Sequence, residues 1–167
     1  ASGKSTIAKA IRRIIPGSAY ISEESIQDKH QNELKRQKLV YEDICKLIRS
    51  SLKKNKAVIV EGQMSYVSDV PLIRRYERFA RKHADNVFLF FLKISKESSL
   101  RRNSQRKRKL SEQTIDILFR EMELSRDKNE IVIDASKPQI KIVDDIIEKT
   151  DLKKSVIRYF LFRLANL

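Results

Sequence analysis

Short runs of apolar residues alternate along the chain with longer stretches in which apolar residues recur every three or four positions. A continuous apolar run between polar segments is typical of a strand covered on both faces, whereas the wider spacing is typical of an amphipathic helix. The predicted strands are residues 18–21, 57–60, 86–94 and 130–134. The predicted helical segments are residues 6–15, 25–54 (more than one helix), 71–80, 95–109, 111–126, 138–149 and 151–167.

Local signals support several of these boundaries. Pro16 and Gly17 are expected to end the first helix, and Pro71 is suited to the first turn of a later one. Ser95 and Ser111 are expected to act as N-caps. The helix positions predicted to face the core are Ile7, Ala10, Ile11, Ile14 and Ile15 in the first helix, and Leu39, Val40, Ile44, Leu47, Ile48 and Leu52 in the second.

Strands that alternate with helices of this length predict parallel βαβ units, so the fold class is α/β. The length of 167 residues fits one domain, which we place at residues 1–150, with residues 151–167 as a helical extension of the same domain. Ligands of parallel sheets bind beyond the carboxyl ends of the strands. This rule directs attention to Glu24 and Glu61, which follow or end two of the predicted strands.

The second half of the phosphate-binding motif G-x-x-x-x-G-K-[ST] is present in the opening residues Ala1, Ser2, Gly3, Lys4, Ser5 and Thr6. In such loops the backbone N–H groups surround the phosphates, the lysine contacts the β- and γ-phosphates, and the hydroxyl binds magnesium. These six residues are therefore predicted to bind ATP, with Ser5 as a Mg²⁺ ligand. The alternative is an ordinary helix start with an exposed lysine.

A strand and a further glycine normally precede this half of the motif, and neither is present in the sequence. We therefore expect the chain to begin inside the motif. The fragment is expected to be inactive or nearly so by itself.

The charge balance is strongly positive, with 36 Lys and Arg residues against 22 Asp and Glu residues and a net charge of +14. One interpretation is a polyanionic partner such as nucleic acid, and the other is a lysine-rich composition with scattered charges. The single cysteine, Cys45, excludes an internal disulfide. The sequence has no membrane-span or signal-peptide pattern. A single cysteine suits a reducing cytoplasm, which is the expected location. His30 and His83 lack the spacing of a zinc site or a catalytic triad.

The segments 1–6, 21–27, 58–62, 100–106 and 131–134 follow one another in the order found in one group of kinases. Together they resemble the nucleotide-kinase branch of the P-loop proteins, in particular small kinases related to polynucleotide kinase, zeta toxin and seryl-tRNA kinase. The resemblance implies a three-layer sandwich with sheet order 2-3-1-4-5. Because the loop-bearing first strand is missing here, we expect either an empty position between the strands at 57–60 and 86–94, or their direct pairing in a shifted register.

The resemblance also suggests roles for four charged residues. Glu24 is a candidate general base or acceptor-orienting group, although the family often has Asp followed three residues later by Arg, where this chain has Glu24 and Gln27. Glu61 is a candidate magnesium ligand through water, and the alternative is a salt bridge to Lys4 or to an arginine of the lid. Arg102 and Arg106, four positions apart, are candidates to clamp the transferred phosphoryl group. The alternative for this pair is a solvated basic face, and for Glu24 a solvated acid at a helix start.

The function implied is transfer of the γ-phosphate of ATP, with Mg²⁺, to a hydroxyl or phosphate of a small molecule or nucleotide. Two alternatives stay open: a kinase that acts on nucleic acid, such as an RNA end or an aminoacyl-tRNA, and a nucleotide-binding ATPase or regulatory module without an acceptor. The family often has an arginine where this chain has Gln27, and that arginine helps to bind the substrate. The resemblance therefore does not identify the phosphate acceptor of this chain.

Overall fold

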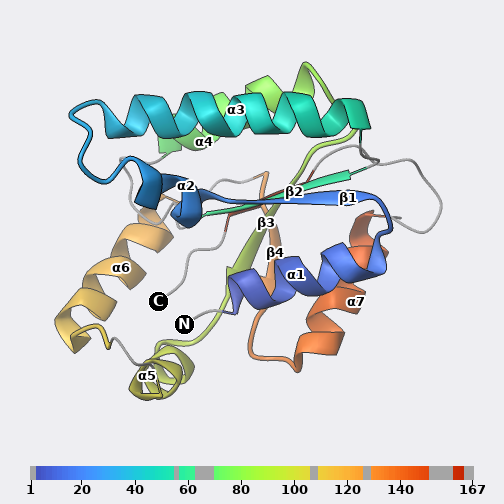
Figure 1. Cartoon of the computed structure of the whole chain (residues 1–167). Helices are drawn as coiled ribbons and strands as arrows, with labels where there is room; N and C mark the ends of the chain where they lie inside the picture. The colour runs from blue at the N-terminus through green and yellow to red at the C-terminus, as the bar shows by residue number, and fades with distance from the viewer. Residues whose placement is uncertain are drawn as a thin grey trace.

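Five strands in the described part of the chain form a single parallel sheet (Figure 1). The structure is a computed structural model, and it describes residues 3–54, 57–62, 70–105, 109–125 and 129–150 together with the backbone of residues 160–163. The sheet order is β1-β2-β5-β3-β4. The strands are β1 (Ser18–Ser22), β2 (Ala57–Gly62), β3 (Phe88–Lys93), β4 (Ile131–Asp134) and β5 (Phe160–Arg163).

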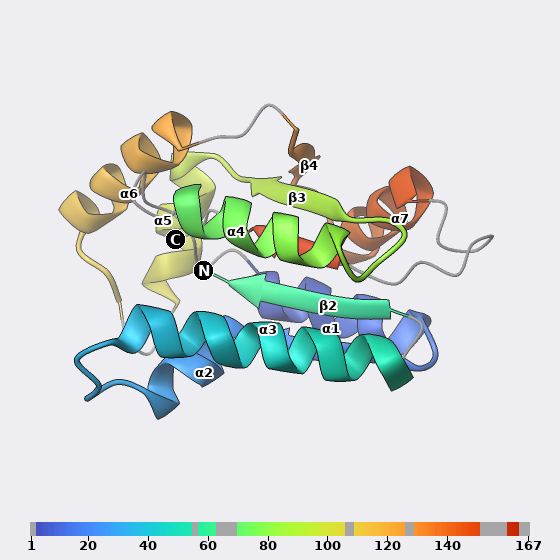
Figure 2. The ribbon, with the colours of Figure 1, turned by 90° about the horizontal axis from the view of Figure 1, so that it is seen from above.

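Helices cover both faces of this sheet, so the chain forms three layers. Figure 1 shows α1 and α7 together on one face and α3 and α4 on the other, and Figure 2 shows α3 and α4 side by side over the near face. The helices are α1 (Lys4–Ile14), α2 (Glu23–Lys29), α3 (Arg36–Lys54), α4 (Val70–Arg81), α5 (Lys96–Ser104), α6 (Glu112–Leu124) and α7 (Gln139–Thr150). None of these described helices combines the length and the apolar character that a membrane span requires.

The strand β2 shows why the sheet is covered on both sides. All of its residues are buried, and successive side chains contribute to different cores. Ala57 and Ile59 pack with α1 and α7, whereas Val58 and Val60 pack with α3 and α4. This division follows from the two-residue period of a strand, and it confirms the parallel α/β class predicted from the uninterrupted apolar run.

Most predicted boundaries agree with the structure. The strand predicted at residues 18–21 is β1, and the strand predicted at 86–94 contains β3. Both predicted N-caps are confirmed, because the Ser95 hydroxyl accepts a hydrogen bond from the Ser98 amide and the Ser111 hydroxyl accepts one from the Thr114 amide, each at 3.1 Å. Two predicted core positions are wrong: Ile14 and Leu47 are exposed by 45% and 41%. Both lie at the margin of an apolar helix face that is narrower than the sequence spacing suggested.

The centre of the sheet corrects two predictions. Residues 160–163 form β5 and not a helix, and β5 pairs in parallel with β2 on one side and β3 on the other. The position between β2 and β3 is therefore neither empty nor closed by their direct pairing. The physical reason is that a short apolar segment fits a helical or an extended pattern, while the facing N–H and C=O groups of β2 and β3 are satisfied only by another strand. The rest of the predicted C-terminal helix lies outside the described residues.

Candidate functional site

The residues predicted to bind phosphate lie at the start of α1, directly after a glycine. Gly3 precedes the helix in the left-handed conformation, with φ 77° and ψ 13°, and its carbonyl accepts the Ile7 amide at 2.8 Å. A side chain would be strained at this φ, which explains glycine here. The first turn carries no acidic residue, and the N-cap residue provides no side-chain hydrogen bond. Lys4 and Ser5 open the helix, Thr6 is exposed, and Ala1 and Ser2 lie outside the described residues.

Glu61 is the centre of a hydroxyl cluster at the carboxyl edge of the sheet. One of its oxygens, Oε1, accepts hydrogen bonds from the hydroxyls of Ser5 at 3.1 Å, Tyr20 at 3.0 Å and Ser22 at 3.1 Å. The side chain is only 2% exposed. Three donors converging on one carboxylate oxygen hold the Glu61 side chain in a single orientation next to the first turn of α1.

The second carboxylate oxygen of Glu61 is a different case. Oε2 is buried and has no hydrogen-bond partner among the described residues. A buried carboxylate oxygen without a hydrogen-bond partner destabilises the folded state, and in native proteins such a group usually contacts an ion or an ordered water. Mg²⁺ commonly takes one or two carboxylates and completes its coordination with water and substrate phosphates. The donor set of Glu61 and Ser5 fits a magnesium ion in this way.

Tyr20 is tied electrostatically to Glu61. Burial, then the negative charge of Glu61 and the hydrogen bond to it, raise the pKa of Tyr20 from 10.0 to about 12. The phenol therefore keeps its proton and keeps donating to Glu61 throughout the physiological range. Sequence analysis missed Tyr20 and Ser22, because the predicted strand ended at residue 21; in the structure β1 extends to Ser22, and the spacing of two places both side chains on one face.

The two acidic residues at the start of α2 have opposite environments. Glu23 is buried, at 3% exposure, whereas Glu24, the residue singled out from the sequence, is exposed. Glu23 packs against Gly62, where an added Cβ would overlap the Glu23 carboxylate and lie 3.0 Å from its Cδ. Glycine at position 62 therefore leaves room for a second carboxylate beside Glu61. The sequence alone did not distinguish Glu23 from its neighbour.

The predicted lid arginines are only partly described. The Arg102 guanidinium donates to the Ala135 carbonyl at 3.0 Å, which anchors α5 to the segment after β4. Arg106 lies outside the described residues. The structure thus places Arg102 at the carboxyl edge of the sheet, and its role as a clamp stays a prediction.

The other titratable groups of the described residues form no cluster that could hold a metal ion. Within residues 3–54, 57–62, 70–105, 109–125 and 129–150, no group of three or more His, Cys, Asp and Glu side chains could hold a metal ion. His30 contacts Asp43 at 3.0 Å, and His83 packs against the ring of Phe79. The described chemistry is therefore concentrated at Ser5, Tyr20, Ser22 and Glu61.

The site brings together a glycine-led helix start, a lysine, a serine and a buried acid at the end of the neighbouring strand. A search of curated proteins finds no significant match to the chain. A family model described as "Chromatin associated protein KTI12" matches residues 1–159. The chain therefore belongs to the KTI12 family, a family of P-loop-containing proteins.

Proposed function

We propose that this protein binds ATP with Mg²⁺ at the start of α1 and transfers the γ-phosphoryl group to a hydroxyl or phosphate acceptor. The observation that carries the proposal is the contact of Ser5 with Glu61, whose other oxygen is buried and has no partner in the described chain. A hydroxyl beside an acid at the end of the adjacent strand is the arrangement by which P-loop proteins hold magnesium.

Each residue of this site has a distinct role in the proposal. The N–H groups after Gly3 and the positive end of α1 bind the phosphates, and Lys4 provides a point charge to the β- and γ-phosphate oxygens. Ser5 and Glu61 hold the magnesium ion, which when bound neutralises charge on the phosphates. Tyr20 and Ser22 keep the Glu61 carboxylate oriented. The rate would come mainly from positioning and electrostatic stabilisation.

The acceptor side of the proposal rests on Glu24 and the lid arginines. Glu24 is exposed at the first turn of α2, directly after β1, so its carboxylate is accessible to an acceptor hydroxyl. Arg102 and Arg106 would contact the γ-phosphate from α5 and the residues after it. The neighbouring Glu23 is packed against Gly62 and is better suited to holding this edge of the sheet together.

A second candidate function is an ATPase or regulatory module that has no acceptor other than water. It is favoured by the engagement of Arg102 with the Ala135 backbone, because a clamp that is already bonded must be released before it can contact a phosphate. The family description, which names a chromatin-associated protein, also favours a regulatory or nucleic-acid-linked role. The net charge of +14 agrees with a polyanionic partner or acceptor.

The magnesium site is tested with Glu61→Gln and Lys4→Ala. We expect both substitutions to weaken binding of a fluorescent ATP analogue, and Glu61→Gln to remove the Mg²⁺ dependence of that binding while the Mg²⁺-free affinity stays nearly unchanged. Glu33→Gln removes an exposed carboxylate outside the site and is the matched control. If Glu61→Gln keeps the full response to Mg²⁺, the assignment of Glu61 is wrong.

The acceptor is tested by ATP turnover with RNA, with a metabolite panel and with neither. Phosphate found on a small molecule would support the first candidate. Stimulation by RNA, with a steep loss at higher salt, would indicate a nucleic-acid acceptor. Turnover that no acceptor changes, and that Glu24→Gln leaves intact, would select the ATPase.

A further inference from the structure

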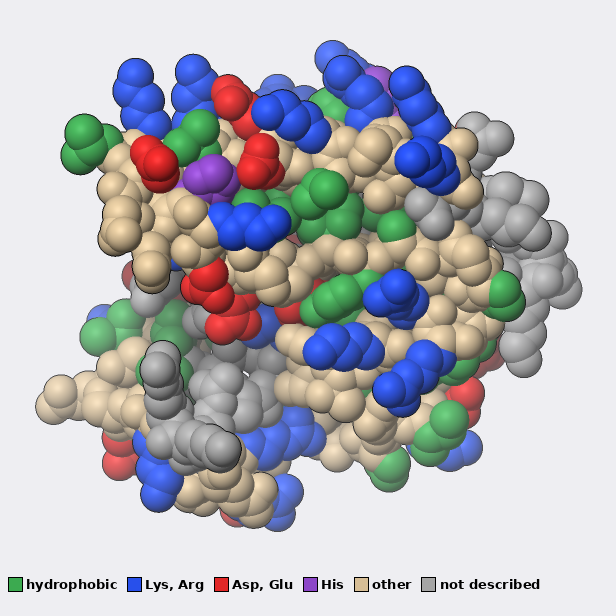
Figure 3. All heavy atoms as spheres, viewed as in Figure 1, with side chains coloured by type: hydrophobic (Ala, Val, Ile, Leu, Met, Phe, Trp, Pro, Cys, Tyr) green, Lys and Arg blue, Asp and Glu red, His purple; other side chains and the backbone are tan. Residues whose placement is uncertain are grey.

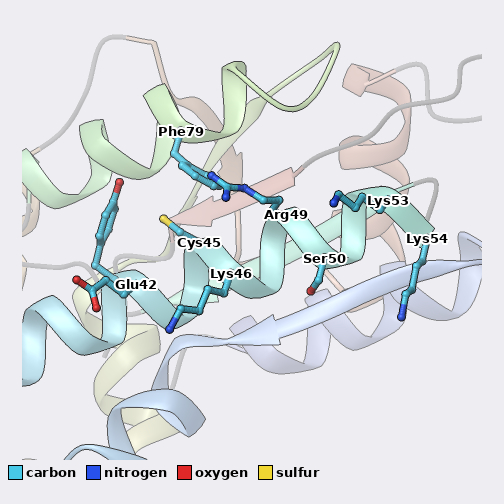
Figure 4. A pocket seen from close by; sticks show the side chains of 9 residues that line it. Glu42, Cys45, Lys46, Arg49, Ser50, Lys53, Lys54 and Phe79 are labelled. Carbon is cyan, nitrogen blue, oxygen red and sulfur yellow. The ribbon is translucent and has the colours of Figure 1, made fainter.

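A shallow groove runs along the outer face of α3, on the side of the sheet opposite α1. It encloses about 480 Å³, and Phe79 of α4 contributes to its lining (Figure 4). This volume is in the range of ligand and peptide pockets. The lining residues are Tyr41, Glu42, Cys45, Lys46, Arg49, Ser50, Lys53, Lys54 and Phe79.

The floor of the groove is apolar and its rim is basic. Tyr41, Cys45 and Phe79 form the floor, and Figure 4 shows Cys45 and Arg49 on the side of α3 that faces Phe79. The exposed rim carries four cations, which are Lys46, Arg49, Lys53 and Lys54. Glu42 is the single carboxylate of the lining, and it is already 3.9 Å from the ammonium group of Lys38.

The same excess of positive charge is visible on the molecular surface. Figure 3 shows Lys and Arg side chains along the upper edge of the molecule, over α3 and α4. The groove spans residues 41–54 of α3, which corresponds to about 20 Å of helix. An apolar trough of this length with a cationic rim is complementary to a short amphipathic helix whose polar face is acidic.

The aromatic rings argue against a single-stranded nucleic acid as the occupant. Such ligands stack their bases on open aromatic faces. Here the Tyr41 ring is covered by the Arg75 guanidinium at 4.5 Å and by Tyr76 at 5.2 Å. The Phe79 ring is flanked by Arg49 at 5.5 Å and by His83 at 4.6 Å. The rings therefore present edges and neighbouring cations to a ligand, which suits aliphatic anchors better than bases.

From these observations we infer that the α3–α4 groove binds an acidic amphipathic helix of a partner protein. Leu or Ile side chains of that helix pack on Tyr41, Cys45 and Phe79. Its Glu and Asp side chains pair with Lys46, Arg49 and Lys53 along the rim. The groove lies on the opposite face of the sheet from α1 and α7, so a partner can bind without covering those helices (Figure 2).

The test uses a fluorescent, helix-stabilised peptide of about four turns with Leu at i, i+4 and i+7 and Glu on the opposite face. We expect it to bind with a dissociation constant of about 10 µM or tighter, and a peptide of the same composition in scrambled order to bind at least about tenfold more weakly. The double variant Lys46→Glu, Lys53→Glu should weaken binding at least about tenfold. The control Lys141→Glu, Lys149→Glu makes the same charge change on exposed residues of α7 and should change binding less than about threefold.

Cys45 gives a second measurement, because it is the single cysteine of the chain and lies on the groove floor. The bound peptide should slow alkylation of Cys45, and the scrambled peptide should not. Equal binding of both peptides, an equal loss in the two double variants, or no protection of Cys45 would overturn the inference. Protection by an oligoribonucleotide but not by the peptide would also overturn it and would assign the groove to RNA. Binding of the fluorescent ATP analogue, followed in parallel, keeps this outcome separate from that of the proposed nucleotide site.

Discussion

The environment of Glu61 depends on three hydroxyl groups from two elements, α1 and β1. Ser5 comes from the first turn of α1, and Tyr20 and Ser22 come from alternate positions of β1. Hydrogen bonds to a charged acceptor are the stronger kind, each contributing about 1.5–3 kcal/mol. All three converge on Oε1, and the other oxygen has no partner among the described residues; this is the oxygen to which we assign the magnesium ion in the proposed function.

Substitution of Tyr20 by Phe should reveal this network through the pH dependence of stability. The pKa of Tyr20 is raised from 10.0 to about 12 in the folded protein, so the folded state keeps a proton that the unfolded chain loses above pH 10. The stabilising contribution of Tyr20 is therefore complete below about pH 10 and is lost as the pH rises toward 12.

We expect Tyr20→Phe to lower the free energy of unfolding at pH 8 and to make its decline between pH 10 and 12 less steep. Urea unfolding at several pH values measures both effects. The pKa of Tyr41 is also raised, mainly by burial, but Tyr41 is present in both proteins and its contribution cancels in the comparison. A variant whose pH profile runs parallel to that of the wild type would contradict the assignment.

At the scale of elements, the connections at the carboxyl edge are held by single side chains. Asn103 of α5 donates to the Leu110 carbonyl at 2.9 Å and accepts the Leu110 amide at 3.0 Å. It is 6% exposed. The Asn103 side chain thus bonds both backbone groups of Leu110, as a neighbouring strand would, and holds the residues just before α6 in place.

Replacing Asn103 by Ala should therefore destabilise the protein by about 1–3 kcal/mol, because two backbone groups of Leu110 lose their partner. Asn103→Asp keeps the oxygen that accepts from the Leu110 amide and loses the N–H group that donates to the Leu110 carbonyl. We therefore expect the hydrogen bond of the amide to persist and that of the carbonyl to be lost. Hydrogen exchange at Leu110 and tryptic cleavage after the exposed Lys109 report the local change. Equal protection of Leu110 in the wild type and in Asn103→Ala would show that the segment is held by other contacts.

The contact between Gly62 of β2 and Glu23 of α2 leaves little room for a larger residue at position 62. A Cβ at Gly62 would overlap the Glu23 carboxylate, so we expect Gly62→Ala to cost about 1–3 kcal/mol of stability. In a Glu23→Ala background the same substitution should cost much less, since the overlapping group is gone. A double-mutant cycle measured by chemical unfolding quantifies this coupling. Additive effects would mean that the two residues do not press on one another.

At the scale of the whole molecule, the net charge of +14 makes the folded protein repel itself. Cations are close to one another on the rim of the α3–α4 groove, where the lining has Lys46, Arg49, Lys53 and Lys54 and one carboxylate, Glu42, although Lys46 also lies 3.7 Å from Asp43. Added salt screens such repulsion, with a Debye length that falls from about 30 Å at 0.01 M to about 10 Å at 0.1 M.

We therefore expect the thermal midpoint to rise when NaCl is increased from about 10 to about 200 mM. Calorimetry or circular dichroism measures the shift, and a neutral sugar at equal osmolality is the control. The double variant Lys46→Glu, Lys53→Glu lowers the net charge by four and should show a smaller response. A midpoint that falls with salt would indicate that attractive ion pairs dominate over the repulsion.

The amino-acid pattern alone determined the α/β class, most of the helices and strands and the residues that begin the proposed nucleotide site. These features follow from local rules, since periodicity shows which face is buried and serine caps or a Gly-Lys-Ser sequence act within a few residues. The exposed Ile14 and Leu47 show the limit of such rules, because periodicity alone does not give the width of the buried face.

Tertiary structure alone decided which acids are buried and which strand lies in the centre of the sheet. Glu23 and Glu24 are neighbours in the sequence, but the approach of Gly62 buries one and leaves the other in solvent. The segment at residues 160–163 reads locally as helix or strand, and the open hydrogen-bonding edges of β2 and β3 make it a strand. In both cases the deciding contact joins residues far apart in the sequence, and a local pattern carries no information about such contacts.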